Sequence, residues 1–230
     1  MVNWILHIET STKNCSVALG CDGELINSIE KSSENYSHGE KLHPFIKELI
    51  DDSQINLTQL SAISVSKGPG SYTGLRIGVS AAKGLCYSLN IPLISLNSLS
   101  ILSQNIRVSK DTLLVPMIDA RRMEVYTQIL DYQHKVLKNT WAEVLNENSF
   151  KKYLLTHNII AFGVGSEKSK NLIVSPNFKV HEELQEPSAK SMVRLTYEKW
   201  KKKKFEDIAY FEPYYLKEFY TNHPPKPLTP

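Results

Sequence analysis

The chain has 230 residues, of which 41% are hydrophobic, and its 27 Lys and Arg against 24 Asp and Glu give a net charge of +3. This length allows one large domain or two compact lobes, and the composition excludes a disordered chain. The small net charge gives no argument for a dedicated nucleic-acid binder. Cys15, Cys21 and Cys86 form no CxxC pair, so we expect free thiols and a cytoplasmic protein. No apolar run approaches the roughly 18 residues that a membrane-spanning helix needs.

The first third of the chain begins with three predicted strands. Residues 4–8 are apolar, and Cys15, Val17 and Leu19 alternate with small residues, as in a half-buried strand. The pair Asp22-Gly23 is a tight-turn signal before a third strand at residues 24–29. Three strands joined by short turns predict an antiparallel meander.

Helical spacing follows the meander. Apolar residues from Leu42 to Leu49 recur at intervals of three and four, and Pro44 either kinks this helix or marks its start. The next predicted elements, in order, are a strand at 62–66, a helix at 75–89, a strand at 92–96 and a short helix at 99–106. The order β-β-β-α-β-α-β-α is that of the ribonuclease H-like core, on which actin-like proteins build two lobes. The predicted fold class is therefore α/β, actin-like.

A reduced second set of elements begins at residue 113. It comprises predicted strands at 113–118, 125–130, 141–145 and 159–162, and helices at 150–155 and about 187–203. We therefore assign residues 1–106 to the first lobe and 107–230 to a smaller second lobe. Residues from about 205 are expected to pack back on the first lobe.

The segment KGPGSYTGLRIG, Lys67 to Gly78, joins a predicted strand to a predicted helix. Amide groups at a helix start attract anions, so a phosphate site is one interpretation. Its candidate residues are Gly68, Gly70, Ser71, Thr73 and Gly74. No GK[ST] follows at the spacing of a Walker A motif, and glycine-rich turns without ligands are common. A structural turn is the favoured interpretation of this loop.

The helix after this loop carries a second, small-residue stripe beside its core-facing one. The stripe, Ile77, Ala81, Gly84 and Ser88, would let another helix approach closely. Together with Leu42, Ile46 and Ile50 on the preceding helix, it is a candidate partner interface. Packing inside the same domain is the alternative, and periodicity does not separate the two.

Several motifs are similar to those of the bacterial TsaB (YeaZ) family, within the glycoprotease-like group. The matching pieces are ILHIETSTKNCSVAL, SHGEKLHPFIKELI, ISVSKGPGSYTGLRIGVSAAKGL, PLISLNSL, PMIDARRMEVY and EPYYLK. The resemblance implies a role in making N6-threonylcarbamoyladenosine at position 37 of tRNAs that read ANN codons. It implies a TsaD-like transferase and a TsaE-like ATPase as partners, and contact with tRNA through the complex. Independently of the resemblance, we expect a homodimer through the candidate partner interface when the partner is absent, because an exposed pair of small and apolar helix faces would otherwise face water.

Comparison with the catalytic paralogue TsaD tests whether this chain keeps the residues that bind metal and nucleotide there. The metal-binding histidines of TsaD correspond to Ser98 and Leu102, and an acidic pair corresponds to Lys13 and Asn14. No GGVxxN-like nucleotide loop occurs. The resemblance therefore implies no catalytic residue, no metal and no cofactor. An actin-fold ATPase or a metallopeptidase acting alone remains the alternative.

A run of four lysines, Lys201 to Lys204, ends the last predicted helix. Interaction with the helix dipole and solvation explain it adequately. Direct contact with a tRNA backbone is the lesser hypothesis.

Overall fold

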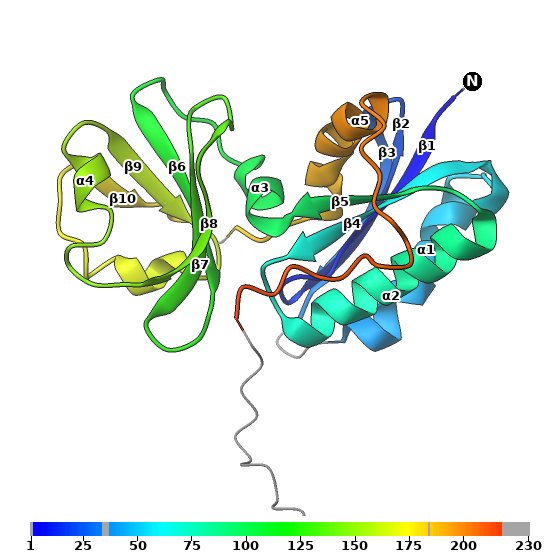
Figure 1. Cartoon of the computed structure of the whole chain (residues 1–230), viewed down its shortest axis with the longest axis horizontal. Helices are drawn as coiled ribbons and strands as arrows, with labels where there is room; N and C mark the ends of the chain where they lie inside the picture. Colours follow the sequence, from blue (N-terminus) through cyan, green and yellow to red (C-terminus); the bar gives the residue numbers. More distant parts are fainter. Residues whose placement is uncertain (1, 34–36, 184, 218–230) are drawn as a thin grey trace, which may run out of the picture.

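The structure, a computed structural model, describes residues 2–33, 37–183 and 185–217. Figure 1 shows two lobes, each built on one sheet. The first lobe contains β1 (Trp4–Glu9), β2 (Asn14–Cys21), β3 (Glu24–Ser32), α1 (His38–Asp52), a 3-10 turn (Leu57–Gln59), β4 (Leu60–Gly68), α2 (Tyr72–Leu89), β5 (Leu93–Asn97) and α3 (Ser98–Ser103). The second contains β6 (Thr112–Asp119), β7 (Glu124–Leu130), β8 (Val136–Val144), α4 (Lys151–Leu154), β9 (Asn158–Phe162), a 3-10 turn (Ser166–Ser169) and β10 (Phe178–Val180).

The first sheet has the strand order β3-β2-β1-β4-β5. β1, β2 and β3 are antiparallel, and β4 and β5 run parallel to β1. This is the ribonuclease H-like arrangement, so the α/β, actin-like fold class is confirmed. In the described part of the chain, the second sheet has the order β10-β9-β6-β7-β8.

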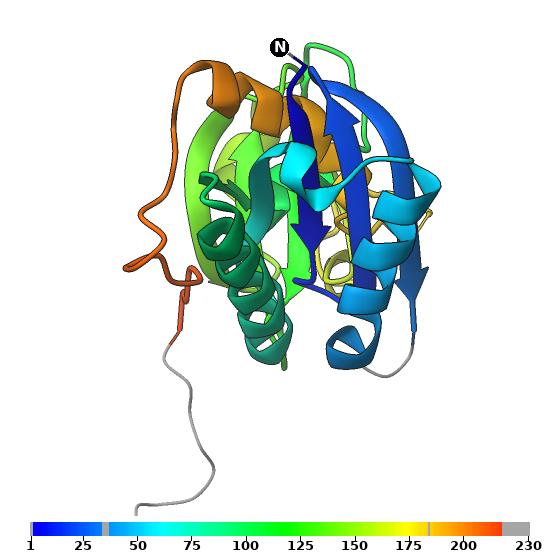
Figure 2. The same cartoon turned by 90° about the vertical axis from the view of Figure 1, so that its right-hand side faces the viewer.

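Both faces of the first sheet are covered. Leu6 and Ile8 pack in the cluster under α1 and α2, whereas Ile5 packs with Trp200 of α5 (Val193–Lys201) on the opposite face. Figure 2 shows α1 and α2 together in front of the sheet and α5 behind it. A strand covered on both faces buries nearly every side chain, which is why β1 shows no alternation of buried and exposed residues, and its polar residues His7 and Glu9 are buried as well.

The chain returns to the first lobe earlier than the sequence predicted. The turn Ala189–Met192 and α5 both pack on the first sheet, although residues up to about 204 were assigned to the second lobe. The assignment was wrong because helical spacing shows that one face of α5 is apolar but not which sheet that face covers. None of the helices in the described ranges is long and apolar enough to span a membrane.

Residues 205–217 form a strap that follows α5 along the first lobe. The amide of Glu206 donates to the carbonyl of Leu93 over 2.8 Å, and the amide of Tyr214 donates to the carbonyl of Lys67 over 2.7 Å. At its end, the Lys217 ammonium pairs with the Glu124 carboxylate of the second lobe. The strap therefore contacts both lobes; residues 218–230 lie outside the described part.

Candidate functional site

The glycine-rich loop lies where β4 ends and α2 begins. Ser71 is the N-cap of α2, and its hydroxyl accepts a hydrogen bond from the Gly74 amide over 3.2 Å. A serine in this position satisfies one of the free amides of the first turn. The helix therefore starts at Tyr72, three residues before the predicted start at residue 75.

The turn between β1 and β2 occupies the space in front of this helix start. The Ser11 carbonyl accepts a hydrogen bond from the Ser71 amide over 2.7 Å, and the Thr10 hydroxyl donates to the Gly74 carbonyl over 2.8 Å. A Cβ at Gly70 would overlap the Ser11 carbonyl oxygen, and one at Gly74 would overlap the Thr10 carbonyl oxygen. The glycines thus allow close packing within the chain.

The anion-site candidates do not converge on one ligand position. Gly70, Ser71 and Gly74 gather around the β1–β2 turn, but Thr73 is exposed. Gly68 has a φ of +107°, and a Cβ there would press on Leu75 and on the carbonyl of Tyr214. This geometry favours the structural-turn interpretation over a phosphate cradle.

A buried carboxylic acid that sequence reasoning missed lies under the same turn. One oxygen of Glu9 accepts hydrogen bonds from the Ser11 amide at 2.5 Å and the Ser66 hydroxyl at 3.0 Å. Burial raises the pKa of Glu9 to about 7, against the opposing effect of these hydrogen bonds. The sequence feature that could have identified Glu9 is an ionisable residue at the end of an apolar strand. Because Glu9 is fully buried and its hydrogen bonds go to Ser11 and Ser66, we interpret it as support for the turn.

The two positions that correspond to metal-binding histidines in the paralogue hold a serine and a leucine in this chain. Ser98 begins α3 and is fully buried, and Leu102 packs with Leu114 and Phe162 where the two lobes meet. Within residues 2–33, 37–183 and 185–217, no three His, Cys, Asp or Glu side chains gather closely enough to hold a metal ion.

The predicted interface residues on α2 lie at or near the surface. Gly84 and Ser88 are exposed, and a Cβ at Gly84 would meet no atom within 4 Å. Ile77 is half-buried, whereas Ala81 is only 9% exposed at the edge of the core. The accessible part of the stripe is therefore its C-terminal half, beside Tyr87, which is 83% exposed.

The predicted interface residues on α1 are not at the surface. Leu42, Ile46 and Ile50 are all at most 6% exposed and belong to the core of the first lobe. This part of the interface prediction is wrong, because the one apolar stripe of α1 is used to cover the sheet. The outer face of α1 instead presents His43 and Lys47.

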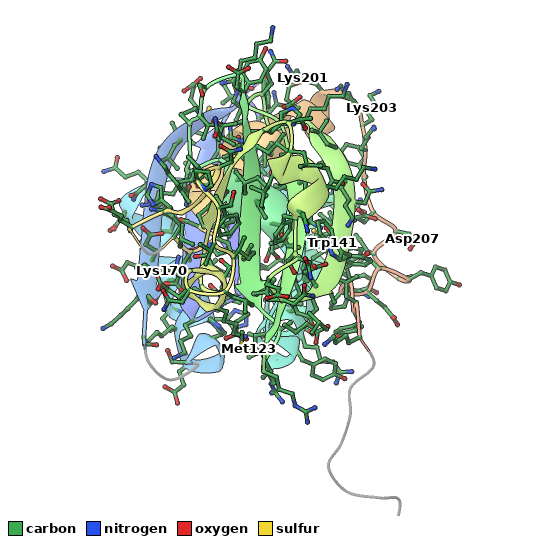
Figure 3. All side chains as sticks on the ribbon, turned by 90° about the vertical axis from the view of Figure 1, so that its left-hand side faces the viewer. Met123, Trp141, Lys170, Lys201, Lys203 and Asp207 are labelled. Atoms are coloured by element: carbon green, nitrogen blue, oxygen red, sulfur yellow. The ribbon has the colours of Figure 1, made fainter. Side chains whose placement is uncertain are left out.

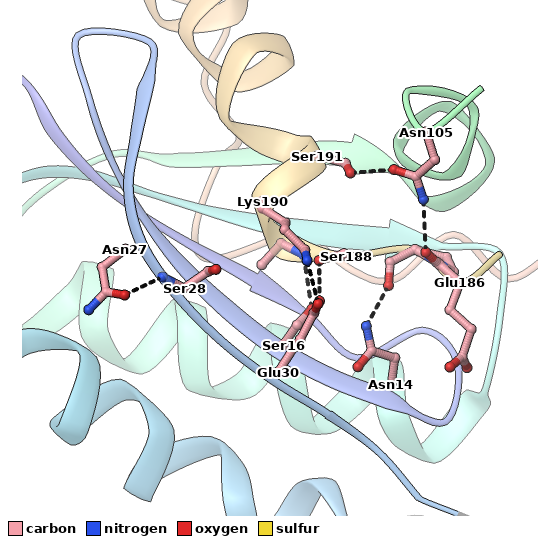
Figure 4. Close-up of polar contacts among 12 residues, drawn as sticks. Asn14, Ser16, Asn27, Ser28, Glu30, Asn105, Glu186, Ser188, Lys190 and Ser191 are labelled. Carbon is pink, nitrogen blue, oxygen red and sulfur yellow. Dashed lines mark hydrogen bonds and ion pairs between the residues drawn. The ribbon is translucent and has the colours of Figure 1, made fainter. Parts of the chain in front are cut away.

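A polar cleft of about 410 Å³ lies where the linker before α5 crosses β2 and β3. Figure 4 shows Ser188 and Lys190 reaching Glu30, at 2.6 and 2.5 Å. The side-chain amide of Asn14 donates to the Pro187 carbonyl over 3.1 Å. These polar groups bond to one another, so the cleft is the place where the linker is fixed to the first lobe.

Comparison with known proteins gives consistent matches. The sequence model of the family described as "TsaD: tRNA N6-adenosine threonylcarbamoyltransferase" matches residues 30–218. The chain is 36% identical to the tRNA threonylcarbamoyladenosine biosynthesis protein TsaB of Bacillus subtilis over 167 residues, which cover 66% of this chain and 70% of that protein. It is 31% identical to TsaB of Buchnera aphidicola from Acyrthosiphon pisum, over 78% of this chain and 86% of that one.

A solved structure has the same fold. A Pseudomonas aeruginosa protein, described as uncharacterised with similarity to peptidase YEAZ, superposes with a TM-score of 0.81 at 25% identity. The superposition covers 94% of this chain and 100% of that one.

Proposed function

Since this chain belongs to the TsaB family of tRNA threonylcarbamoyladenosine biosynthesis proteins, we propose that it is a non-catalytic partner of a TsaD-like transferase. In this role it supports formation of N6-threonylcarbamoyladenosine at position 37 of tRNAs that read ANN codons. The reaction takes place in the cytoplasm, and a TsaE-like ATPase joins the pair.

The proposal that the chain is not itself a catalyst rests on the packing of Leu102 between the two lobes. Where the paralogue has two imidazoles, this chain has a buried serine and Leu102, which is enclosed by apolar side chains of both lobes. A metal ion needs nitrogen, oxygen or thiolate ligands that are free to face it. The side chain of Leu102 offers none and packs among apolar residues, which leaves the Ser98 hydroxyl as the single donor atom of the two positions.

The partner surface in this proposal is the exposed half of the α2 stripe. Gly84 and Ser88 have no bulky side chains, so the backbone of a partner helix can approach α2 closely there. Tyr87 adds a large exposed ring of the kind that is enriched in interfaces. In the absence of the transferase, the same surface pairs two copies of this chain.

Reconstitution tests the proposal. The purified chain alone should neither hydrolyse ATP nor modify tRNA, and modification should appear when it is added to the transferase, the ATPase and threonylcarbamoyl-adenylate. No gain of modification in that mixture would refute the partner role. ATP hydrolysis or peptide cleavage by the chain alone would favour the ATPase or metallopeptidase alternative.

A matched pair of variants tests the surface. Gly84→Arg should abolish binding to the transferase while the circular dichroism spectrum and unfolding midpoint stay near those of the wild type. Val174→Arg, at a position 93% exposed in the second lobe, is the control and should bind normally. If both variants bind with wild-type affinity, the α2 assignment is wrong.

A further inference from the structure

The C-terminal end of α5 presents a basic surface that the partner role does not use. We define it as the lysine tip: Lys201, Lys202, Lys203 and Lys204, all of them exposed. The helix closes with the Lys203 amide donating to the Trp200 carbonyl at 2.9 Å and the Lys204 amide donating to the Lys199 carbonyl at 3.0 Å. Figure 3 shows Lys201 and Lys203 together at one end of the molecule.

The lysine tip is largely uncompensated. Lys201 pairs with Glu198 at 2.6 Å, but Lys202, Lys203 and Lys204 form no ion pair among the described residues. The Glu206 carboxylate, two residues after Lys204, accepts a hydrogen bond from the Ser95 hydroxyl and forms no ion pair with the tip lysines in the described part of the chain. The helix dipole stabilises cations only within the last turn, and adjacent like charges repel one another. Interaction with the helix dipole therefore accounts for only part of the run, which revises the explanation that the sequence alone favoured.

Aromatic side chains lie among the lysines. The Phe205 ring is 41% exposed and 5.5 Å from the Trp200 ring, and the Lys201 ammonium lies over the Tyr197 ring at 5.2 Å. Lysines beside an exposed ring are the combination that binds phosphates and stacks on an unpaired base.

An anionic membrane is a less suitable ligand for the same charges. An interfacial helix needs an apolar face free to enter the lipid. In α5 that face is buried, because Trp200 packs against Ile5, Ala62 and Ile94 of the first sheet. The tip therefore presents charge with little insertable apolar surface.

The position of the tip is compatible with the proposed complex. The α1 and α2 helices lie on one face of the first sheet and α5 lies on the other (Figures 1 and 2). A transferase helix docked on Gly84 and Ser88 therefore approaches from the face of the sheet opposite to α5, although Lys83 beside this surface reaches the strap carbonyls of Ala209 and Phe211.

We propose that the lysine tip binds the phosphate backbone of the tRNA that the complex modifies. This inference rests on the proposed function, since it takes the substrate from it. Each lysine that neutralises a phosphate releases condensed counterions, so binding weakens steeply as salt rises. The contact is independent of sequence and adds affinity and orientation rather than chemistry.

The proposed contact is tested by measuring how tightly the complex of this chain with the transferase binds tRNA at several salt concentrations. The variant K202Q/K203Q/K204Q should bind unmodified tRNA roughly tenfold more weakly near 100 mM salt, with the slope of log K against log salt reduced by about 2. The control K151Q/K152Q/K179Q removes three exposed lysines of the second lobe and should leave both quantities unchanged. Equal binding by the tip variant and the wild type would overturn the proposal, as would equal losses in the two variants.

Two further measurements distinguish failure of the tRNA proposal from failure of the proposed partner role. Binding of the chain to phosphatidylglycerol vesicles that is lost in the tip variant, with tRNA binding unchanged, would overturn the RNA assignment in favour of a membrane. The tip variant should still bind the transferase as tightly as the wild type, and loss of that binding would also overturn the proposal. Failure of the wild type in the modification assay would refute the partner role independently of tRNA affinity.

Discussion

The Ser11 carbonyl accepts a hydrogen bond from the Ser71 amide over 2.7 Å, and so fixes the β1–β2 turn to the start of α2. Sixty residues of sequence separate these two groups. The contact explains the loop glycines, because a side chain on this side of the helix would push the turn away.

Gly70→Ala should therefore destabilise the fold. The added Cβ would overlap the Ser11 carbonyl oxygen, and overpacking of this kind costs about 1–3 kcal/mol. Gly84→Ala is the control: its Cβ meets nothing within 4 Å, and alanine inside a helix should add about 0.5–1 kcal/mol of stability. Urea unfolding midpoints should move in opposite directions, and a rise in both would contradict the packing argument.

Much of the first lobe could be predicted from sequence. The meander follows from alternation and the Asp22-Gly23 turn, and the strand and helix around the glycine-rich loop follow from uninterrupted apolar spacing. The reason for the glycines could not be predicted, because it depends on Thr10 and Ser11, which are distant in sequence from the loop. β10 was also missed, since three residues carry too short a pattern.

The candidate site was harder to predict for a related reason. Periodicity identifies an apolar stripe on a helix but not what covers it. Leu42 on α1 and Ile77 on α2 both looked available to a partner, yet the first is fully buried and the second is half-buried. Glu9 was overlooked because its partner Ser66 lies on a different strand.

Leu42→Ala should act on stability rather than on partner contacts. Removing a fully buried leucine side chain leaves a cavity and costs about 2–5 kcal/mol in the free energy of unfolding. His43→Ala, at the exposed neighbour, should stay within about 0.5 kcal/mol. Chemical denaturation compares the two. Wild-type stability of the Leu42 variant together with lost transferase binding would restore the original interface prediction.

Glu9 should make stability depend on pH. Its pKa is about 7 in the folded protein against an ordinary value of 4.5, so the folded state binds more protons than the unfolded state between these values. Its contribution is complete below pH 4.5 and is lost as pH rises through 7. The stability of the wild type relative to Glu9→Gln should therefore fall from pH 5 to pH 8. Parallel stability curves for the two proteins over that range would show that Glu9 does not titrate as described.

His7 should give the stability of the fold the opposite pH dependence to that of Glu9. Burial lowers its pKa to about 3, so the folded state holds the ring neutral while the unfolded chain takes up a proton below about pH 6.5. Its contribution to stability is present above pH 6.5 and is lost as pH falls toward 3. Relative to His7→Gln, the wild type should lose stability between pH 6.5 and pH 4, measured by urea unfolding. A constant difference would mean that the ring does not remain neutral in the fold.

Leu102 should hold the two lobes together. Its side chain is fully buried, and a Cβ at Gly163 of the second lobe would collide with it, so the chain after β9 depends on glycine to pass this close. Leu102→Ala removes that contact and should cost about 2–5 kcal/mol, whereas Leu102→Met keeps most of the volume and should cost less than about 1.5 kcal/mol. Denaturant unfolding measures both, with Leu155→Ala, at an exposed position, as the neutral control. Wild-type stability of the alanine variant would mean that this contact between the lobes contributes little. It would also remove the argument that packing has replaced a ligand at this position.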